Sequence, residues 1–390
     1  MKKIISIFSI HPVQYHSPLF NELHKSENFK FKILYFSNYG ATISYDKDFN
    51  EEFKWDNLSL NKHEHYFLNI NNQRNLTINF FNYLYKIVNF VKNSHAIIIF
   101  GWNSPYYFFV VLFSFFLSIP IILLSEENLI KKDNFLKKIW KKIIFFNLFK
   151  IFDHFISIGT HNTNFYISHG VEKKKIHQTF YSVDTNFFKN SSKNKTLKYN
   201  IKKKYNLSKK DFIFIWVGKF IERKNPFEAI LAFQLLKKKK LHLIMVGSGK
   251  LLETCKNYII ENNIKNIYLV GFKNQKHLLN FYRISHSLII TSKHETWGLV
   301  LNEAMSVGLP CIATSSCGAS KDLIKTNYNG YVYHSGSTQE LSDKIKKISE
   351  SRNYKFLKKN TILHIKKFSL EKTTFEIIES LKKIFYEEKK

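Results

Sequence analysis

The chain has 390 residues and a mass of 46.4 kDa, more than one hydrophobic core usually serves, so two domains are expected. Hydrophobic residues make up 44% and aromatic residues 16%, which excludes a mostly disordered or fibrous chain. The net charge of +30 fits an anionic partner, such as a phosphorylated substrate, an anionic membrane or a nucleic acid, and the over-use of Lys, Asn, Ile and Phe equally fits a coding bias.

The N-terminal segment, MKKIISIFSI, starts like a signal peptide, but its apolar run is short and no small-residue cleavage site follows, so it is predicted to be a first buried strand. Similar short apolar runs recur between longer segments with helical spacing, a pattern typical of parallel strands joined by crossover helices. The predicted fold class is therefore α/β. In the first half, strands are expected at residues 3–10, 31–36, 96–100, 119–124, 154–158 and 176–180.

The most membrane-like stretch runs from Tyr106 to Leu124 and permits two interpretations. One is a transmembrane helix. The other is a helix over residues 105–118 followed by a buried strand over residues 119–124. Pro120 breaks a helix and therefore favours the second interpretation.

A polar stretch rich in Lys, Asn and Ser at residues 189–210 has few large apolar side chains to bury, and it is predicted to connect two domains. The first domain then covers residues 1–188 and the second covers residues 211–368. Strands of a second doubly wound sheet are expected at residues 212–217, 241–246, 267–270, 287–291, 311–314 and 330–333.

An amphipathic helix is predicted over residues 369–388, with Ser369 as its N-cap. Its apolar positions recur at three- to four-residue spacing on one face, at Phe375, Ile378, Leu381 and Phe385. Such a helix needs a partner, and it is expected to pack back on the first domain.

The densest group of candidate site residues is HETWGLVLNEAM at residues 294–305, directly after an expected strand. A loop and then a helix starting at Gly298 are predicted there. The first backbone N–H groups of that helix, at Gly298 and Leu299, would form a site for a diphosphate. The carboxylates of Glu295 and Glu303 could reach a donor sugar and a ribose; the alternative is two solvent-exposed acids beside a core helix.

A second group directly follows the strand expected at residues 212–217, where Gly218, Lys219 and Lys224 lie around a turn. The carboxyl ends of parallel strands are where such folds bind ligands. Two cations there could neutralise a diphosphate that departs as a glycosidic bond breaks. The alternative is a pair of solvated loop lysines.

Together, these two groups resemble the retaining glycosyltransferases of family 4, which have the GT-B fold and carry two acids separated by seven residues, as Glu295 and Glu303 are. The resemblance extends through VGSG, GLPCIATSSCGASKDLI and FSLEKTT, and it covers essentially the whole second domain. It implies two Rossmann-like doubly wound domains facing a central cleft. It also implies an enzyme that moves a sugar from a nucleotide diphosphate donor to a glycan or lipid-linked acceptor, in cell-surface polysaccharide synthesis.

The resemblance assigns a role to each candidate in the second domain. Glu295 lies near the donor sugar, Glu303 binds the ribose, and Lys219 and Lys224 hold the diphosphate, with Gly218 in the same turn. The family usually has Arg at the position of Lys219, so this lysine keeps the charge but loses the bidentate fork.

Neither a covalent nucleophile nor a metal or other cofactor is expected. In the family, the departing phosphate is thought to help deprotonate the acceptor, and helix and lysine charges can replace a divalent cation. The motif Asp46-Lys47-Asp48 lies in a polar stretch with no buried strand leading into it, so it is predicted to bind no metal.

The first domain departs from the family pattern at two loops. HPVQYHSP replaces the Gly-rich loop after the first strand, and there Gln14 and His16 are either contacts for the acceptor or sugar, or ordinary loop residues. After the strand expected at residues 119–124, Glu126 and Glu127 stand near the usual position of a histidine. Either of them could hydrogen-bond the sugar or acceptor, Glu126 then being a catalytic candidate, or both could cap the next helix.

Two other classes of protein stay open. A non-hydrolysing sugar-nucleotide epimerase shares the architecture but needs no acceptor. A non-enzymatic basic protein would bind a membrane or a nucleic acid, but no nucleic-acid module is recognised, so a nucleic-acid partner is not expected.

The location is expected to be the cytoplasm. The three cysteines form no paired spacing and suit a reducing cytoplasm. The basic surface and the aromatic segment from Tyr106 to Phe116 favour docking on the inner face of the plasma membrane.

Overall fold

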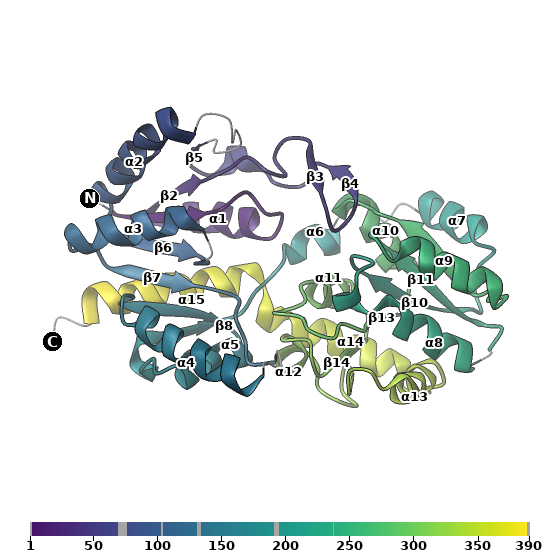
Figure 1. The fold of residues 1–390 in the computed structure, drawn as a ribbon. Coiled ribbons are helices and arrows are strands. Elements are labelled where there is room, and N and C mark those ends of the chain that lie inside the picture. The colour runs from purple at the N-terminus through teal and green to yellow at the C-terminus, as the bar shows by residue number, and fades with distance from the viewer. Residues whose placement is uncertain are drawn as a thin grey trace. The chain divides into compact units, whose positions relative to one another are not determined.

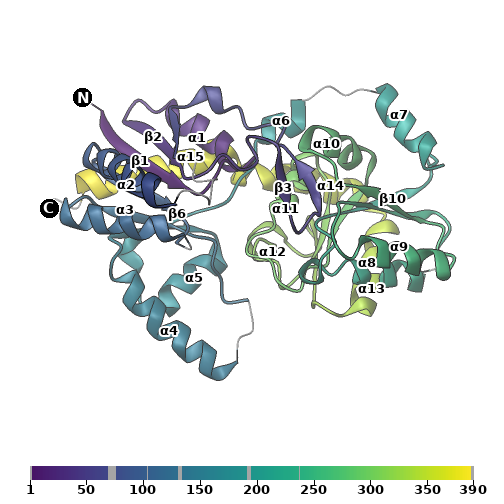
Figure 2. The same cartoon turned by 45° about the horizontal axis from the view of Figure 1, so that its top comes forward.

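The computed structural model describes residues 2–68, 76–102, 104–130, 134–190, 195–236 and 238–387. The chain divides into two compact units, each with its own sheet (Figures 1 and 2). Unit 1 comprises residues 1–44, 57–181 and 370–390, and unit 2 comprises residues 45–56 and 182–369. The stretch expected to connect two domains, residues 189–210, thus falls within unit 2, where its described part includes the helix α7 (Lys195–Lys204).

Unit 1 is built on a seven-stranded parallel sheet with the order β5-β2-β1-β6-β7-β8-β9. The order runs outward from β1 in both directions, so the carboxyl ends of β1 and β6 mark the topological switch point where such sheets bind ligands. The strands are β1 (Lys3–Ser9), β2 (Phe29–Tyr35), β5 (His65–Phe67), β6 (Ala96–Phe100), β7 (Ile121–Leu124), β8 (His154–Ile158) and β9 (Ile176–Thr179).

Helices cover both faces of this sheet. On one face, buried side chains of four helices pack into a single core with strand residues such as Ile97; these helices are α2 (Leu76–Lys92), α3 (Pro105–Phe116), α4 (Phe135–Phe149) and α5 (Thr160–Ser168). The connection from β1 to β2 runs the other way across the sheet, which places α1 (His16–His24) on the opposite face. There α1 packs against α15 (Leu370–Lys382).

Unit 2 is built on a six-stranded parallel sheet with the order β12-β11-β10-β13-β14-β15. Its strands are β10 (Phe212–Val217), β11 (Leu241–Val246), β12 (Ile267–Gly271), β13 (Ser287–Ile290), β14 (Cys311–Thr314) and β15 (Gly330–Tyr333). Its other helices are α6 (Thr185–Asn190), α8 (Pro226–Leu236), α9 (Leu252–Glu261), α10 (Gln275–Ile284), α11 (Val300–Ser306), α12 (Ser320–Leu323), α13 (Thr338–Ser349) and α14 (Tyr354–Ile365).

Short elements complete the fold. A two-stranded sheet joins β3 (Ser44–Asp46) to β4 (Glu51–Phe53), and residues 45–56 of this hairpin belong to unit 2 although they precede most of unit 1 in the chain. Short 3₁₀ helices are η1 (Leu60–Lys62), η3 (Lys173–Lys175), η4 (Glu222–Lys224) and η5 (Lys366–Phe368), and a turn of π-helix is η6 (Lys383–Glu387).

The two parallel sheets confirm the predicted fold class. The strands expected at residues 96–100, 154–158, 212–217, 241–246, 311–314 and 330–333 coincide with β6, β8, β10, β11, β14 and β15. The membrane-like stretch forms α3 and then β7, which confirms the second of its two interpretations. Within the described ranges, no helix combines the length and the apolar character needed to cross a bilayer.

The prediction for the last helix was wrong in one respect. Phe375, expected on the buried face of α15, is 54% exposed, whereas Ile377 and Leu381 are buried. The buried face also includes Thr373, whose hydroxyl donates a hydrogen bond to the Phe180 carbonyl at 2.9 Å. The buried face of α15 therefore contains polar as well as apolar residues, and it differs from the purely apolar face that was expected.

The lowered pKa values of four histidines lead us to expect that the protein loses stability in mild acid. Desolvation lowers the pKa of each to about 4, and they are His16, His63, His177 and His286. Protonation below the unfolded pKa of about 6.5 therefore favours the unfolded chain, so their stabilising contribution is complete above that pH and lost as the pH falls towards 4.

Glu228, whose pKa burial raises to about 7, acts in the opposite direction, but it is one group against four. We expect the melting temperature to fall steadily from pH 6.5 to pH 4.5, and a His63→Gln variant to show a shallower fall. A flat profile over this range would contradict the assignment of neutral, desolvated histidines.

Candidate functional site

The loops after β10 and β13 meet because these two strands are neighbours in the sheet of unit 2. The Thr291 hydroxyl donates to the backbone carbonyls of Lys224 and Asn225 at 2.9 and 2.8 Å, and it accepts a hydrogen bond from the Trp216 indole at 2.9 Å. The backbone N–H of Lys293 also donates to the Arg223 carbonyl at 2.8 Å. The structure thus joins the two groups of candidate residues at the carboxyl edge of the sheet, where doubly wound folds bind ligands.

Glu295 lies at the centre of this junction. Its side chain is buried and forms ion pairs with Lys224 and, at 3.3 Å, with Arg223. Burial alone would raise the pKa of Glu295, but the Lys224 ammonium and the Arg223 guanidinium outweigh it and hold the pKa below its ordinary value. The site therefore contains an ionised carboxylate paired with two cations, of which Arg223 was not predicted.

Glu303 is the second buried acid of the motif, and it is 1% exposed. Tyr282 donates its hydroxyl to one carboxylate oxygen at 2.7 Å, and the Gln275 amide donates to the other at 3.2 Å. Both donors come from α10, and nothing in the sequence indicates that α10 lies beside Glu303. The burial of Glu295 and Glu303 contradicts the alternative of two solvent-exposed acids.

The helix that carries Glu303 begins later than predicted. It starts at Val300, with Leu299 at the N-cap position, whereas Gly298 has a φ of +103° that no helical residue adopts. A side chain at Gly298 would bring its Cβ within 2.7 Å of the Cys317 sulfur. Glycine is therefore required by both the backbone conformation and the close packing of this loop.

Lys219 is held by the hairpin of residues 45–56. Its ammonium lies 3.0 Å from both carboxylate oxygens of Asp46 and 3.2 Å from Asp48, and 4.6 Å from the centre of the Phe49 ring. Burial favours a raised pKa for Asp46, yet hydrogen bonds from the Phe49 backbone and from Lys219 hold that pKa below its ordinary value. The motif Asp46-Lys47-Asp48, which was expected to lie in a polar stretch, is part of a hairpin and supplies two anions to Lys219.

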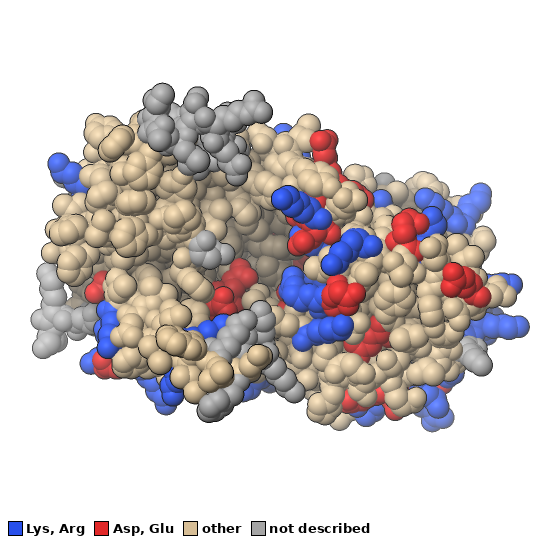
Figure 3. All heavy atoms as spheres, in the orientation of Figure 1, with Lys and Arg blue, Asp and Glu red and all other residues tan. Residues whose placement is uncertain are grey.

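Gly218 precedes this lysine in a tightly packed turn. The backbone of Gly247, in the loop after β11, lies close to the backbone of Gly218. A Cβ added to Gly247 would lie 1.8 Å from the Gly218 carbonyl oxygen. Figure 3 shows basic and acidic side chains side by side over this part of unit 2.

The candidates of unit 1 are linked through a residue that the sequence did not single out. The Tyr181 hydroxyl donates to the Glu126 carboxylate at 2.8 Å, and it lies 3.3 Å from the Nε2 atom of His16. Desolvation lowers the pKa of His16 to about 4, and desolvation together with Glu126 raises the pKa of Tyr181 well above its ordinary value. The only available signal for Tyr181 was its place just after the strand expected at residues 176–180.

Two buried polar atoms accompany this chain of side chains. Among the described residues, the Oε1 atom of Gln14 and the Nδ1 atom of His16 have no hydrogen-bond partner. The Glu127 carbonyl accepts a hydrogen bond from Asn162 at 2.6 Å. The alternative that Glu126 and Glu127 cap the next helix is wrong, because α4 begins only at Phe135 and has Asn134 at its N-cap position.

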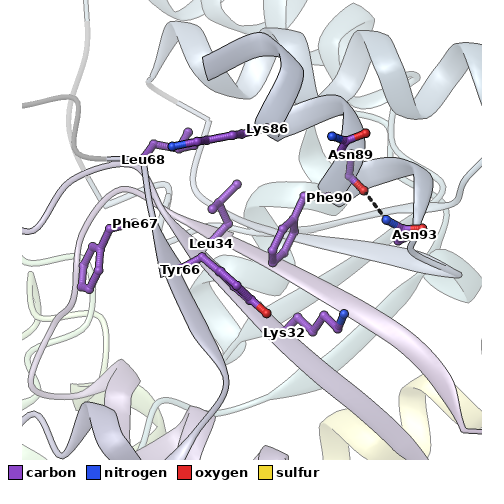
Figure 4. Close-up of a pocket in the computed structure, with 9 residues that line it drawn as sticks. All are labelled: Lys32, Leu34, Tyr66, Phe67, Leu68, Lys86, Asn89, Phe90 and Asn93. Carbon is purple, nitrogen blue, oxygen red and sulfur yellow. Dashed lines mark hydrogen bonds between the residues drawn. The ribbon is translucent and has the colours of Figure 1, made fainter. Parts of the chain in front are cut away.

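A separate cavity of 330 Å³ lies beside α2 in unit 1 (Figure 4). Lys32 and Lys86 line it together with the rings of Tyr66 and Phe90. None of the predicted site residues lines this cavity, so it is distinct from the polar chain at the switch point.

Two parallel α/β sheets are the architecture of the GT-B glycosyltransferases. The structure of Anabaena HepE in complex with UDP has this fold: the TM-score is 0.75, the sequences are 16% identical, and the match covers 98% of this chain and 99% of that chain. Residues 198–356 match the family described as "Glycosyl transferases group 1". This part of the chain is therefore a glycosyl transferases group 1 domain.

Curated relatives match about two fifths of the chain. An uncharacterized glycosyltransferase of Methanocaldococcus jannaschii is 28% identical over 159 residues, which cover 40% of this chain and 44% of the relative. The UDP-Gal:alpha-D-GlcNAc-diphosphoundecaprenol alpha-1,3-galactosyltransferase of Escherichia coli is 26% identical over 160 residues, covering 40% and 41%. The match spans about two fifths of the length of these relatives.

Proposed function

We propose that this protein is a retaining glycosyltransferase that moves a sugar from a nucleotide diphosphate donor to a glycan or lipid-linked acceptor in cell-surface polysaccharide synthesis. The observation that carries the proposal is the buried pair of acids, Glu295 and Glu303, placed with Lys219 and Lys224 at the carboxyl edge of a group 1 domain. The galactosyltransferase of Escherichia coli, whose name specifies a diphosphoundecaprenol acceptor, supports a lipid-linked acceptor for this chain as well.

In the proposed reaction, the bond between the anomeric carbon and the phosphate oxygen breaks, and its electron pair stays on that oxygen. The acceptor oxygen bonds to the same face of the carbon, and its proton passes to the departing phosphate. Lys219 and Lys224 bind the diphosphate, whose negative charge grows in this step, while Glu295 orients the sugar and Glu303 accepts hydrogen bonds from the ribose hydroxyls.

Unit 1 is proposed to bind the acceptor or the sugar through Gln14, His16 and Glu126, with Glu127 nearby. Tyr181 joins Glu126 to His16 and fixes both side chains. Because the pKa of His16 is about 4, its imidazole is neutral near pH 7 and offers a hydrogen-bonding nitrogen without a charge. The proposed place of action is the cytoplasm, at the inner face of the plasma membrane.

A screen of purified protein against UDP-, GDP-, ADP- and dTDP-sugars tests this function. We expect one donor class to raise the melting temperature and to be hydrolysed slowly when no acceptor is present. Transfer to an acceptor with retained configuration would establish the reaction. Conversion of a donor to its epimer would make the enzyme an epimerase, and no stabilisation by any donor would contradict the proposal.

The contacts of Lys219 lead to a prediction about donor affinity. Asp46 and Asp48 form ion pairs with Lys219, the lysine that is proposed to hold the diphosphate. A donor must therefore displace two carboxylates, and the double variant Asp46→Asn, Asp48→Asn is expected to bind a nucleoside diphosphate roughly three- to tenfold more tightly, from about 1 kcal/mol of lost competition.

Isothermal titration calorimetry measures this difference directly. Glu52→Gln is the matched control, because it removes one acid from the same hairpin at an exposed position. Weaker binding by the double variant would mean that the hairpin carboxylates help to bind the donor and do not compete with it.

A further inference from the structure

The hairpin of residues 45–56 lies on the first turn of α10, within unit 2. Asn274, at the N-cap position of α10, donates its side-chain amide to the Lys54 carbonyl at 3.1 Å. The backbone N–H of Lys276 donates to the Asp56 carboxylate at 3.2 Å. The end of the hairpin and the start of the helix thus form one polar junction.

Two buried oxygen atoms at this junction have no hydrogen-bond partner among the described residues, and they are Oδ1 of Asp56 and Oδ1 of Asn274. Both can only accept. The amide nitrogen of Asn274 faces the Lys54 carbonyl, so the other atom of that amide is its oxygen, and the oxygens of an ionised Asp56 are acceptors as well. Because a buried acceptor without a donor is unfavourable, the junction suits a ligand that supplies N–H groups.

The junction lies next to the proposed ribose site. Asn274 directly precedes Gln275, whose amide donates to Glu303 at 3.2 Å. Strand β12 is two places from β10 in the sheet, so the loops after these strands start about 10 Å apart. With the diphosphate at Lys219, after β10, and the ribose at Glu303, the base points towards the junction. A Cβ added to Gly271, at the end of β12, would meet no atom within 4 Å, so the space there is open.

The nucleobases differ in what they offer to two acceptors. Guanine, adenine and cytosine carry an exocyclic amino group, which has two N–H donors. Uracil and thymine have a carbonyl oxygen in place of the amino group of cytosine. That oxygen would face the two unpartnered oxygens of the junction and repel them, so a base with an amino group fits the junction better.

We propose that Asp56 and Asn274 select the base of the donor, and that this base carries an amino group. The inference rests on the proposed transferase function and adds the class of donor, a nucleotide sugar of guanine, adenine or cytosine. The Oδ1 atoms of both residues accept N–H groups from the amino group or, in guanine, from the amino group and the adjacent ring nitrogen.

The test is isothermal titration calorimetry of the full chain with GDP, ADP, CDP, UDP and dTDP. We expect one of the first three to bind roughly ten- to hundredfold more tightly than UDP and dTDP, which leave both acceptors without a donor. Asp56→Asn puts an N–H in the place of one acceptor, because its oxygen stays with the Lys276 N–H. This variant should bind the preferred nucleotide about tenfold more weakly and UDP more tightly than the wild type does.

Inorganic pyrophosphate has no base, so Asp56→Asn should bind it at least as tightly as the wild type does; weaker binding would show a damaged diphosphate site and overturn the inference. Glu52→Gln is the matched control, because it removes an exposed acid from the same hairpin and should keep the base preference. Asn274→Ala removes the other acceptor and is the second variant should Asp56→Asn melt far below the wild type.

Two results overturn the inference and leave the transferase proposal standing. One is a wild type that binds UDP or dTDP as tightly as the other nucleotides or more tightly. The other is an unchanged base preference in both Asp56→Asn and Asn274→Ala. If neither a nucleoside diphosphate nor pyrophosphate binds the wild type, the transferase proposal itself fails, and the inference fails with it.

Discussion

Replacing Glu303 by alanine is expected to weaken donor binding roughly thirtyfold, because a charged hydrogen-bond acceptor is worth about 2 kcal/mol in a desolvated site. The carboxylate is 1% exposed and already accepts hydrogen bonds from Tyr282 and Gln275. These two donors fix its orientation, so the carboxylate can accept hydrogen bonds from vicinal ribose hydroxyls without further loss of side-chain entropy. The measurement is the dissociation constant for the donor nucleoside diphosphate identified in the screen.

Two further variants separate binding from folding in this experiment. Glu303→Ala leaves two buried donors without their acceptor and should itself lower the stability by about 1–3 kcal/mol, so the melting temperature is recorded without ligand. Tyr282→Phe removes the hydrogen bond of 2.7 Å but keeps the carboxylate, and it should cost stability while changing donor affinity by less than about threefold. If Glu303→Ala melts lower but binds the donor as the wild type does, Glu303 has only a structural role.

The second large effect is expected for Glu295→Gln, which should lower kcat by roughly 10²- to 10³-fold, the usual loss when one charged group that acts in the transition state is removed. The substitution keeps the size of the side chain and removes the charge that pairs with Lys224 and Arg223. Both cations then become more available to the diphosphate, so the donor should bind as tightly as before or more tightly. A fall in kcat with unchanged donor affinity is the result that a role in sugar transfer predicts.

Glu222→Gln provides a control of the same charge change in the neighbouring turn, where Glu222 is exposed and pairs with Lys293 at 3.4 Å. It should leave kcat unchanged. A Glu295→Gln variant that loses donor binding, kcat and thermal stability together would instead show that the buried ion pairs only hold the two loops in place.

The class of the fold and the position of most strands can be predicted from the sequence alone. Strands such as Ala96–Phe100 and Phe212–Val217 are buried on both faces, so each forms an unbroken apolar run in the sequence that is visible without any knowledge of its neighbours. The spacing of Glu295 and Glu303 was equally local, because one loop and one helix carry both. The small edge elements β3, β4 and β5 have three residues each and too few apolar side chains to give such a signal.

The contacts between distant side chains could not be predicted from the sequence and are known from the folded chain. Asp46 lies 173 positions before Lys219 in the chain, and His16 lies 165 positions before Tyr181, yet each pair is in contact. Tyr282 and Gln275 reach Glu303 from a different helix, and Arg223 joins Glu295 across two loops. Such pairings depend on strand order and on the packing of loops at the sheet edge. Local periodicity carries no information about either. The candidate acids and bases could therefore be located in the sequence, but the residues that contact them could not.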